Sequence, residues 1–185
     1  MKTFQSLKGH FLLDSGQLRG SYFERSVILM CQHDEEGAFG LVINRPTSSR
    51  LEDGVSVDVP ESVGHLRVYE GGPVQSNVFT YLHADQLILN ANVMPNLNLG
   101  HSIESLSELG ASYSATQQIK VFAGYSGWGG GQLEGELENK AWITCPADLE
   151  RVFHDDPDNL WRNILRDLGW EKRLLADSPD DLSFN

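Results

Sequence analysis

The sequence has few of the features that would mark a membrane, metal or disulfide protein. No apolar run approaches the roughly 20 residues that a membrane-spanning helix needs, and the first segment, MKTFQSLKGHFLLDSG, has only a short apolar patch and no small-residue cleavage site. The two cysteines, Cys31 and Cys145, lie far apart and form no CxxC pair. The six histidines show neither HxxxH nor HxH spacing. We therefore expect a cytoplasmic protein without a metal, a cofactor or a disulfide.

Basic residues are also scarce. The chain has 14 lysines and arginines against 26 aspartates and glutamates, which gives a formal net charge of −12. Affinity for nucleic acid depends largely on basic side chains that contact phosphates. A chain with this net negative charge is therefore repelled by the phosphates overall. The compact basic group is Arg162 and Arg166, one helical turn apart, with Lys172 and Arg173 just after. A solvated helix face accounts for it, and we expect no direct binding to nucleic acid.

Two catalytic glycine motifs are missing from the stretch that most resembles them. A nucleophile elbow needs the pattern GxSxG, whereas the run GYSGW at 124–128 lacks the last glycine. A P-loop needs lysine and then serine or threonine after its second glycine, and here Gly129 is followed by two more glycines. The sequence supports neither chemistry at this place.

The chain does have a marked cluster of glycines after a short apolar segment. Six of its 18 glycines fall between Gly124 and Gly135. Ile119, Val121 and Phe122 before the cluster favour a buried strand, and the leucines at 133 and 137 after it are one helical turn apart. The cluster therefore predicts a strand-to-helix turn, where glycines permit a tight backbone path or the close approach of a ligand.

Two interpretations of this turn stay open. In the first, the glycines only permit a tight turn under the ring of Trp128. In the second, the turn is a binding site, lined by Tyr125, Trp128, Gly130, Gln132 and Glu136. The two interpretations predict different responses to substitution, because a purely structural turn would respond in stability alone.

Two other places could contact a ligand. Asn44 and Arg45 follow an expected strand, and strand ends often carry ligand contacts, although a turn before Pro46 would also use them. Gly71 and Gly72 could bring backbone N–H groups to a ligand, although a tight turn before a proline is the simpler account.

Apolar runs and turn residues predict the order of the elements. Strands are expected within 4–13 and at 26–31, 38–43, 67–70, 78–83, 87–93, 119–122 and 142–143, with a polar, mobile excursion at 47–64 and a turn at 95–100. Helices are expected at 103–109 with Gly110 as its C-cap, after Gly131, after Pro146, and from Pro157 behind an Asp156 N-cap. The last of these carries the apolar stripe Leu160, Trp161, Ile164, Leu165 and Leu168.

This order predicts a single α+β domain over residues 1–170. Strands precede the late helices, which favours a curved, mixed, mainly antiparallel and barrel-like sheet flanked by three or four helices. Residues 171–185 are polar and acidic, and we expect them to form a loosely held tail.

Four segments together resemble the AlgH/YqgE family of bacterial proteins. They are FERSVILMCQHDEEGAFGLVINRP at 23–46, YEGGPV at 69–74, GYSGWGGGQLEGELENKAW at 124–142 and DDPDNLWRNILRDLGW at 155–170. The resemblance covers most of the chain and is consistent with the α+β fold. It implies no agreed biochemical activity, and a role in transcriptional control has been proposed for some members.

For function, we favour a non-enzymatic binding or regulatory protein that engages a small ligand or a protein partner near the glycine cluster. An undiscovered hydrolase-type enzyme and a transcriptional regulator acting on DNA are the alternatives. A cleft with titratable groups of perturbed pKa would favour the enzyme, and a continuous basic face would favour the DNA-binding regulator.

Overall fold

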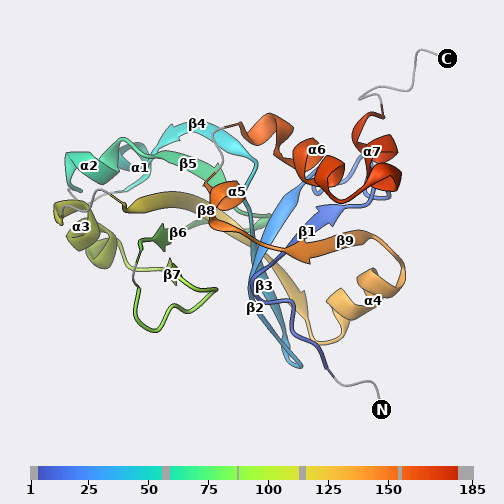
Figure 1. Cartoon of the computed structure of the whole chain (residues 1–185). Coiled ribbons are helices and arrows are strands. Elements are labelled where there is room, and N and C mark those ends of the chain that lie inside the picture. Colours follow the sequence, from blue (N-terminus) through green and yellow to red (C-terminus); the bar gives the residue numbers. More distant parts are fainter. Residues whose placement is uncertain (1–3, 56–58, 87, 113–115, 154–155, 179–185) are drawn as a thin grey trace.

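One open, mixed sheet organises the molecule (Figure 1). The computed structural model describes residues 4–55, 59–86, 88–112, 116–153 and 156–178. The strands are β1 (His10–Asp14), β2 (Val27–Asp34), β3 (Gly37–Val42), β4 (Pro46–Arg50), β5 (Arg67–Glu70), β6 (Val74–Ala84), β7 (Leu97–Gly100), β8 (Gln118–Gly129) and β9 (Trp142–Pro146). The helices are α1 (Leu51–Gly54), α2 (Glu61–Gly64), α3 (Ile103–Ala111), α4 (Gln132–Glu138), α5 (Leu149–Val152), α6 (Pro157–Asp167) and α7 (Trp170–Ala176).

Strand β8 joins the two halves of the sheet. The strand order is β4-β5-β8-β3-β2-β1-β9, and β6 adds to β8 with β7 beside it. The pairing of β5 with β8 is parallel, whereas the other strand pairs of the described residues are antiparallel. The expected α+β class and mainly antiparallel sheet are therefore confirmed, and the sheet does not close into a barrel.

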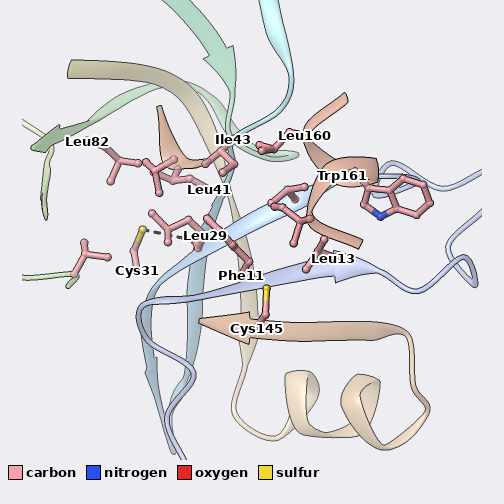
Figure 2. Close-up of a cluster of buried hydrophobic side chains, with 14 of the residues drawn as sticks. Phe11, Leu13, Leu29, Cys31, Leu41, Ile43, Leu82, Cys145, Leu160 and Trp161 are labelled. Atoms are coloured by element: carbon pink, nitrogen blue, oxygen red, sulfur yellow. Dashed lines mark hydrogen bonds between the residues drawn. The ribbon is translucent and has the colours of Figure 1, made fainter. Parts of the chain in front are cut away.

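Side chains alternate between two apolar layers in the half of the sheet that contains β1 and β2. Phe11 and Leu13 of β1 lie in the larger layer, which Figure 2 shows with Leu160 and Trp161 of α6 packed on it. Leu12, between them in sequence, lies in the other layer with Ile28, Met30, Val42, Trp128, Leu133 and Trp142. Helix α4 and partly buried side chains of residues 18–23 cover this second layer.

Helix α6 follows its predicted stripe closely. Asp156 is the N-cap before Pro157, and Leu160, Trp161, Ile164 and Leu165 are buried. Leu168 lies just beyond the helix and is 40% exposed. Residues 170–176, where the expected tail begins, form α7, whose Ala176 is buried in the larger apolar layer. Residues 179–185 of that segment lie outside the described residues.

The connection between β6 and β7 corrects one prediction. The expected strand at 87–93 is wrong, because the described residues 88–93 form turns and bends, and the strand lies instead at Leu97–Gly100, where a turn was expected. Asn90 and Asn96 both adopt positive φ, which asparagine tolerates better than most residues. The Asn92 side chain accepts from Leu99 N at 2.7 Å and donates to Leu99 O at 2.9 Å, so it takes the place of a strand partner.

Three smaller predictions also need correction. Pro146 ends β9 and does not start a helix, since α5 begins at Leu149 behind an Asp148 side chain that accepts from Arg151 N. Gly110 lies inside α3, whose C-cap is Ser112. The stretch 47–64 carries most of β4 together with α1 and α2, and residues 56–58 of it lie outside the described residues.

Among the described helices, none is long and apolar enough to cross a bilayer.

Replacement of Trp161 by alanine tests the packing of α6. Trp161 is 2% exposed, and its indole N–H donates to Asp14 O at 3.0 Å. Because the change leaves a cavity and an unmatched carbonyl, we expect Trp161→Ala to lower the free energy of unfolding by about 3–5 kcal/mol in urea titration. Leu174→Ala, at a side chain that is 70% exposed on α7, is the control and should change it by less than about 0.5 kcal/mol. Equal effects would contradict the packing described for α6.

Candidate functional site

The glycine-rich turn connects β8 to α4 as predicted, with β8 running as far as Gly129. Gly131 has a φ of +78°, a conformation that favours glycine. A Cβ atom on Gly130 would lie 2.8 Å from Glu35 O, and one on Gly37 would lie 2.3 Å from Trp128 O. These glycines therefore let the turn and the β2–β3 hairpin approach each other closely.

A glutamate of α4 is held by two tryptophans. Glu136 Oε2 accepts from Trp128 Nε1 at 2.9 Å and from Trp142 Nε1 at 2.7 Å. Its other oxygen accepts from Gln132 Nε2 at 3.2 Å, and Gln132 Oε1 accepts from Gly129 N at 3.2 Å. Since both indoles are buried and hydrogen bonds to a carboxylate are strong, Glu136 fixes α4 against β8 and β9.

An aromatic cluster extends this network across the sheet. Phe23 stacks with Trp128 at 6.4 Å between ring centroids and meets Trp142 edge-on at 5.7 Å. Tyr22 contacts Phe23 edge-on, and the guanidinium of Arg45 lies 4.5 Å from the centroid of the Tyr22 ring. Burial, followed by the charge of Glu70, raises the pKa of Tyr22 to about 12, so its hydroxyl is protonated at neutral pH.

The loop that carries Tyr22 and Phe23 depends on a buried carboxylate. Asp14 Oδ1 accepts from Gly16 N at 2.8 Å and from Leu18 N at 3.2 Å, and Asp14 Oδ2 accepts from Arg25 N at 2.8 Å. A carboxylate that satisfies three backbone donors fixes the path of the loop between them. No motif or spacing in the sequence marks Asp14.

Asn44 and Arg45 are fixed by neighbouring backbone. Asn44 accepts from Val27 N at 2.9 Å and donates to Arg25 O at 3.0 Å. Arg45 donates to Glu24 O at 3.2 Å, in addition to its contact with Tyr22. Both side chains therefore attach the loop and the start of β2 to the end of β3.

Gly71 and Gly72 lie where two backbone segments cross. A Cβ atom on Gly72 would lie 2.0 Å from the carbonyl carbon of Tyr125, and one on Gly71 would lie 2.4 Å from Gly124 O. Gly71 O accepts from Val42 N at 2.8 Å and from Ser126 Oγ at 3.3 Å. Tyr125 stacks on Phe39 at 4.8 Å.

The structure therefore divides the predicted site residues among three places. Trp128, Gly130, Gln132 and Glu136 come together at the turn, Asn44 and Arg45 lie at the end of β3, and Gly71, Gly72 and Tyr125 lie at the backbone crossing. Tyr22 and Phe23 link Arg45 to Trp128 through ring contacts. That these residues bind a ligand stays a prediction.

A histidine on β2 pairs with α4, a contact that no sequence pattern predicts. His33 Nδ1 accepts from Leu7 N at 2.9 Å, so Nε2 carries the proton and donates to Glu134 Oε1 at 2.8 Å. Both ring nitrogens are thus occupied, and the His33 side chain is only 2% exposed. This arrangement attaches the N-terminal segment and α4 to the β2–β3 hairpin, and it leaves no nitrogen of His33 to act as a base.

The two thiols offer little reactivity. Cys31 and Cys145 are both buried and unbridged, and burial raises the pKa of each thiol. A reactive cysteine needs a lowered pKa and some access to solvent. Within the described part of the chain, no three histidine, cysteine, aspartate or glutamate side chains form a group that could hold a metal ion.

A polar cleft lies at the other half of the sheet, between β6, β7 and α3. It has a volume of about 500 Å³. Its lining consists of Tyr81, His83, Asn92, Asn98, Leu99, Gly100, Ser105, Glu108, Leu109 and Ser112. Gly100 leaves room for the Tyr81 ring, since a Cβ atom there would lie 2.2 Å from Tyr81 Cζ. Polar groups from three elements therefore converge on one concave surface.

Burial changes the titration of two residues in this cleft. Burial lowers the pKa of His83, against a smaller opposing effect of Asp85, so the imidazole is neutral at pH 7. Burial also raises the pKa of Tyr81. The Nε2 atom of His83 is buried and has no hydrogen-bond partner among the described residues. A buried polar atom without a partner costs stability, and a ligand or water that supplies a hydrogen bond recovers part of that cost.

The sequence held only a weak signal for this cleft. Tyr81 and His83 alternate along an expected strand and so share one face of it. Asn92 fell in a misplaced strand, however, and Asn98 fell in an expected turn. The convergence on α3 also depends on the pairing of β6 with β7, which brings His83 opposite Asn98.

The class of protein follows from the fold and these sites. It is a small α+β protein built on one shared central strand, with a polar cleft at one half of the sheet and a glycine-rich turn at the other. A family model described as AlgH-like matches residues 11–173. The chain belongs to this family, and the resemblance drawn from the four sequence segments is confirmed.

Relatives and solved structures agree with this assignment. A UPF0301 protein from Chlamydia caviae is 38% identical over 180 residues, covering 96% of this chain and 95% of the relative. The solution structure of the AlgH protein from Pseudomonas aeruginosa matches with a TM-score of 0.74 and 31% identity, over 98% of this chain and 100% of that chain. The crystal structure of a protein from Corynebacterium diphtheriae matches with a TM-score of 0.75 and 19% identity, over 96% of this chain and 95% of that one, and shows the fold alone.

Substitution of Glu136 tests whether it fixes α4. Glu136→Ala leaves the buried indole N–H groups of Trp128 and Trp142 without an acceptor, so we expect the free energy of unfolding to fall by about 2–4 kcal/mol. Glu136→Gln keeps one carbonyl acceptor and should lose less. Gln132→Ala, at an exposed side chain, should lose less than about 1 kcal/mol. Chemical unfolding followed by tryptophan fluorescence measures all three, and similar losses for Glu136→Ala and Gln132→Ala would refute the assigned role.

The pH dependence of stability tests the burial of His83. A histidine whose folded pKa lies below its unfolded value of about 6.5 binds more protons when unfolded, so its contribution to stability is full above that value and is lost as the pH falls through the folded pKa. We therefore expect the urea midpoint to fall between pH 7.5 and pH 5.5 less steeply in His83→Gln than in the parent. Identical slopes would show that His83 gains its proton equally in both states.

Proposed function

We propose that this protein is a non-enzymatic binding protein that holds a small polar ligand in the cleft between β6, β7 and α3. The observation that carries the proposal is the convergence of hydroxyl, imidazole, amide and carboxylate side chains from three elements around a volume of about 500 Å³. Concave sites with a few converging polar groups are the usual places for small ligands.

The chemistry of the cleft favours a neutral or cationic ligand rich in hydroxyl or amino groups. Its lining contains Glu108 but no lysine or arginine. The carboxylate of Glu108 forms no ion pair with any residue that the structure describes, so it can accept from a ligand. The neutral imidazole of His83 offers a donor at one nitrogen and an acceptor at the other.

Binding without turnover is the part of the proposal that separates it from a hydrolase. The pKa of Tyr81 is raised, which disfavours its use as a base at neutral pH. The net charge of −12 supports a small ligand over DNA. The reduced, buried cysteines support a cytoplasmic location, which belongs to the proposal as well.

The experiment is a titration of the 15N-labelled protein with three probes: glucosamine as a cationic polyol, inositol as a neutral one and glucose 6-phosphate as an anion. We expect amide shifts in β6, β7 and α3 with the first two probes and none with the third. Glu108→Gln should weaken glucosamine binding by about tenfold, as for the loss of a charge-assisted hydrogen bond, and should leave inositol binding nearly unchanged.

Glu104→Gln is the matched control, because Glu104 lies on the same helix but outside the cleft lining. It should change the binding of neither probe. Shifts confined to other parts of the chain, or the absence of any shift at about 10 mM probe, would refute the cleft as the ligand site. Chemical conversion of a bound probe would favour the hydrolase-type alternative.

A further inference from the structure

A second cleft lies on the other side of the molecule, where the connection between α4 and β9 faces α7. It has a volume of about 480 Å³. Leu137, Trp142, Ile143 and Leu175 form its apolar walls, and its polar lining is Ser15, Gln17, Lys140, Glu171 and Lys172. It shares no residue with the cleft assigned above.

Two cations face this cleft in a chain that is strongly acidic overall. Lys140 and Lys172 form no ion pair with any described residue. Lys140 also has a φ of +58°, a conformation in which lysine is uncommon. Its N–H donates to Leu137 O at 3.0 Å, which closes the end of α4 and sets the position of the side chain at the rim.

Ser15 supplies an unmatched polar group to the same cleft. Its Oγ is buried and has no hydrogen-bond partner among the described residues. Ser15 N donates to Ala141 O at 3.1 Å, so the residue is fixed beside the start of β9. The next residue, Gly16, has a φ of +89°, and a Cβ atom there would lie 2.6 Å from Leu175 Cδ1. The chain at 15–16 therefore lies close against α7, with a hydroxyl available to a ligand.

The Trp142 ring is a rigid part of the apolar wall. Trp142 is buried, and its indole N–H is committed to Glu136 at 2.7 Å. The ring orientation is thus fixed before any ligand arrives, which lowers the cost of binding. Glu171 is exposed at the rim and opposes a second negative charge on the ligand.

We propose that this cleft binds a small organic monoanion with a flat apolar body, such as an aromatic carboxylate. The carboxylate lies between Lys140 and Lys172 and accepts from the hydroxyl of Ser15. The aromatic body packs against Trp142, Leu137 and Leu175. The two lysines and the serine hydroxyl together give recognition of a carboxylate, and the Trp142 ring selects a planar partner.

The test uses 2-naphthoate as the probe, with the full chain at neutral pH. We expect a dissociation constant of about 1 mM or tighter, a value typical of a small ligand with a modest contact surface. The indole N–H resonance of Trp142 should shift during the titration. The neutral 2-naphthamide should bind about tenfold more weakly, because it lacks the charge.

Variants separate this site from non-specific adsorption. Lys140→Met and Lys172→Met should each weaken 2-naphthoate binding by about fivefold to tenfold, and Ser15→Ala should weaken it without changing the preference for the anion over the amide. Glu171→Gln should strengthen it. Arg67→Met, which removes a positive charge from an exposed residue of β5 outside the cleft, is the control and should have no effect.

Three results would overturn the proposal. They are equal affinity for the acid and the amide, binding that Lys140→Met and Lys172→Met leave unchanged, and the absence of any Trp142 shift at about 10 mM probe. Both lysines are only partly buried or exposed, so these variants should fold, and their thermal unfolding checks that they do. The cleft between β6, β7 and α3 has different lining residues and is tested with different probes. A negative result for one cleft therefore does not affect the interpretation of the other.

Discussion

At the centre of the sheet, two stretches of backbone pass so close to each other that no side chain fits between them. Gly71 and Gly72 meet Gly124 and Tyr125 there, and Gly124 itself has a φ of +73°. The contact lets one strand, β8, pair with β5 and β6 along its first part and with β3 along its last part. Because both halves of the sheet are anchored to this strand, the cores on either side of the crossing depend on the same few glycines.

The two ends of β8 then determine what can be built around it. At its start, the pairing with β6 brings Tyr81 and His83 under α3 and leaves a polar cleft. At its end, the strand runs into the turn whose glycines meet the β2–β3 hairpin, and Glu136 ties α4 to both tryptophans. In the second arrangement, the side chains of Gln132 and Glu136 and both indole N–H groups have hydrogen-bond partners. The first arrangement is inconspicuous in sequence, yet His83 Nε2 in it has no partner among the described residues. In this fold, the stretch with the most unusual composition is therefore not the place with polar groups free to bind a ligand.

The sequence predicted well what depends on local pattern. The apolar stripe of α6, the strand at 67–70 and the turn after β8 all follow from neighbours within a few residues. The predictions failed where strands far apart in sequence pair, and where a side chain makes the hydrogen bonds that a backbone strand would make. The Asn92 side chain bonds both the N–H and the C=O of Leu99, as a neighbouring strand would. The expected strand at 87–93 is therefore not needed beside β7. The partners of Asp14, His33 and Glu136 follow from strand order and helix placement, which a single sequence does not state. The cleft around His83 was missed for the same reason.

The amide of Asn92 has a wider consequence for the outer border of the sheet. Strand β7 pairs with β6 on one side. On its other side Leu97 forms an isolated antiparallel bridge with Met94, and no other described strand pairs there. An open strand border is a template for another extended chain, and proteins usually obstruct such borders. By occupying the N–H and C=O of Leu99, Asn92 removes two of the hydrogen-bonding groups that an incoming chain would need. The Asn92 carboxamide, together with the bridge between Met94 and Leu97, thus helps this molecule to resist edge-to-edge polymerisation.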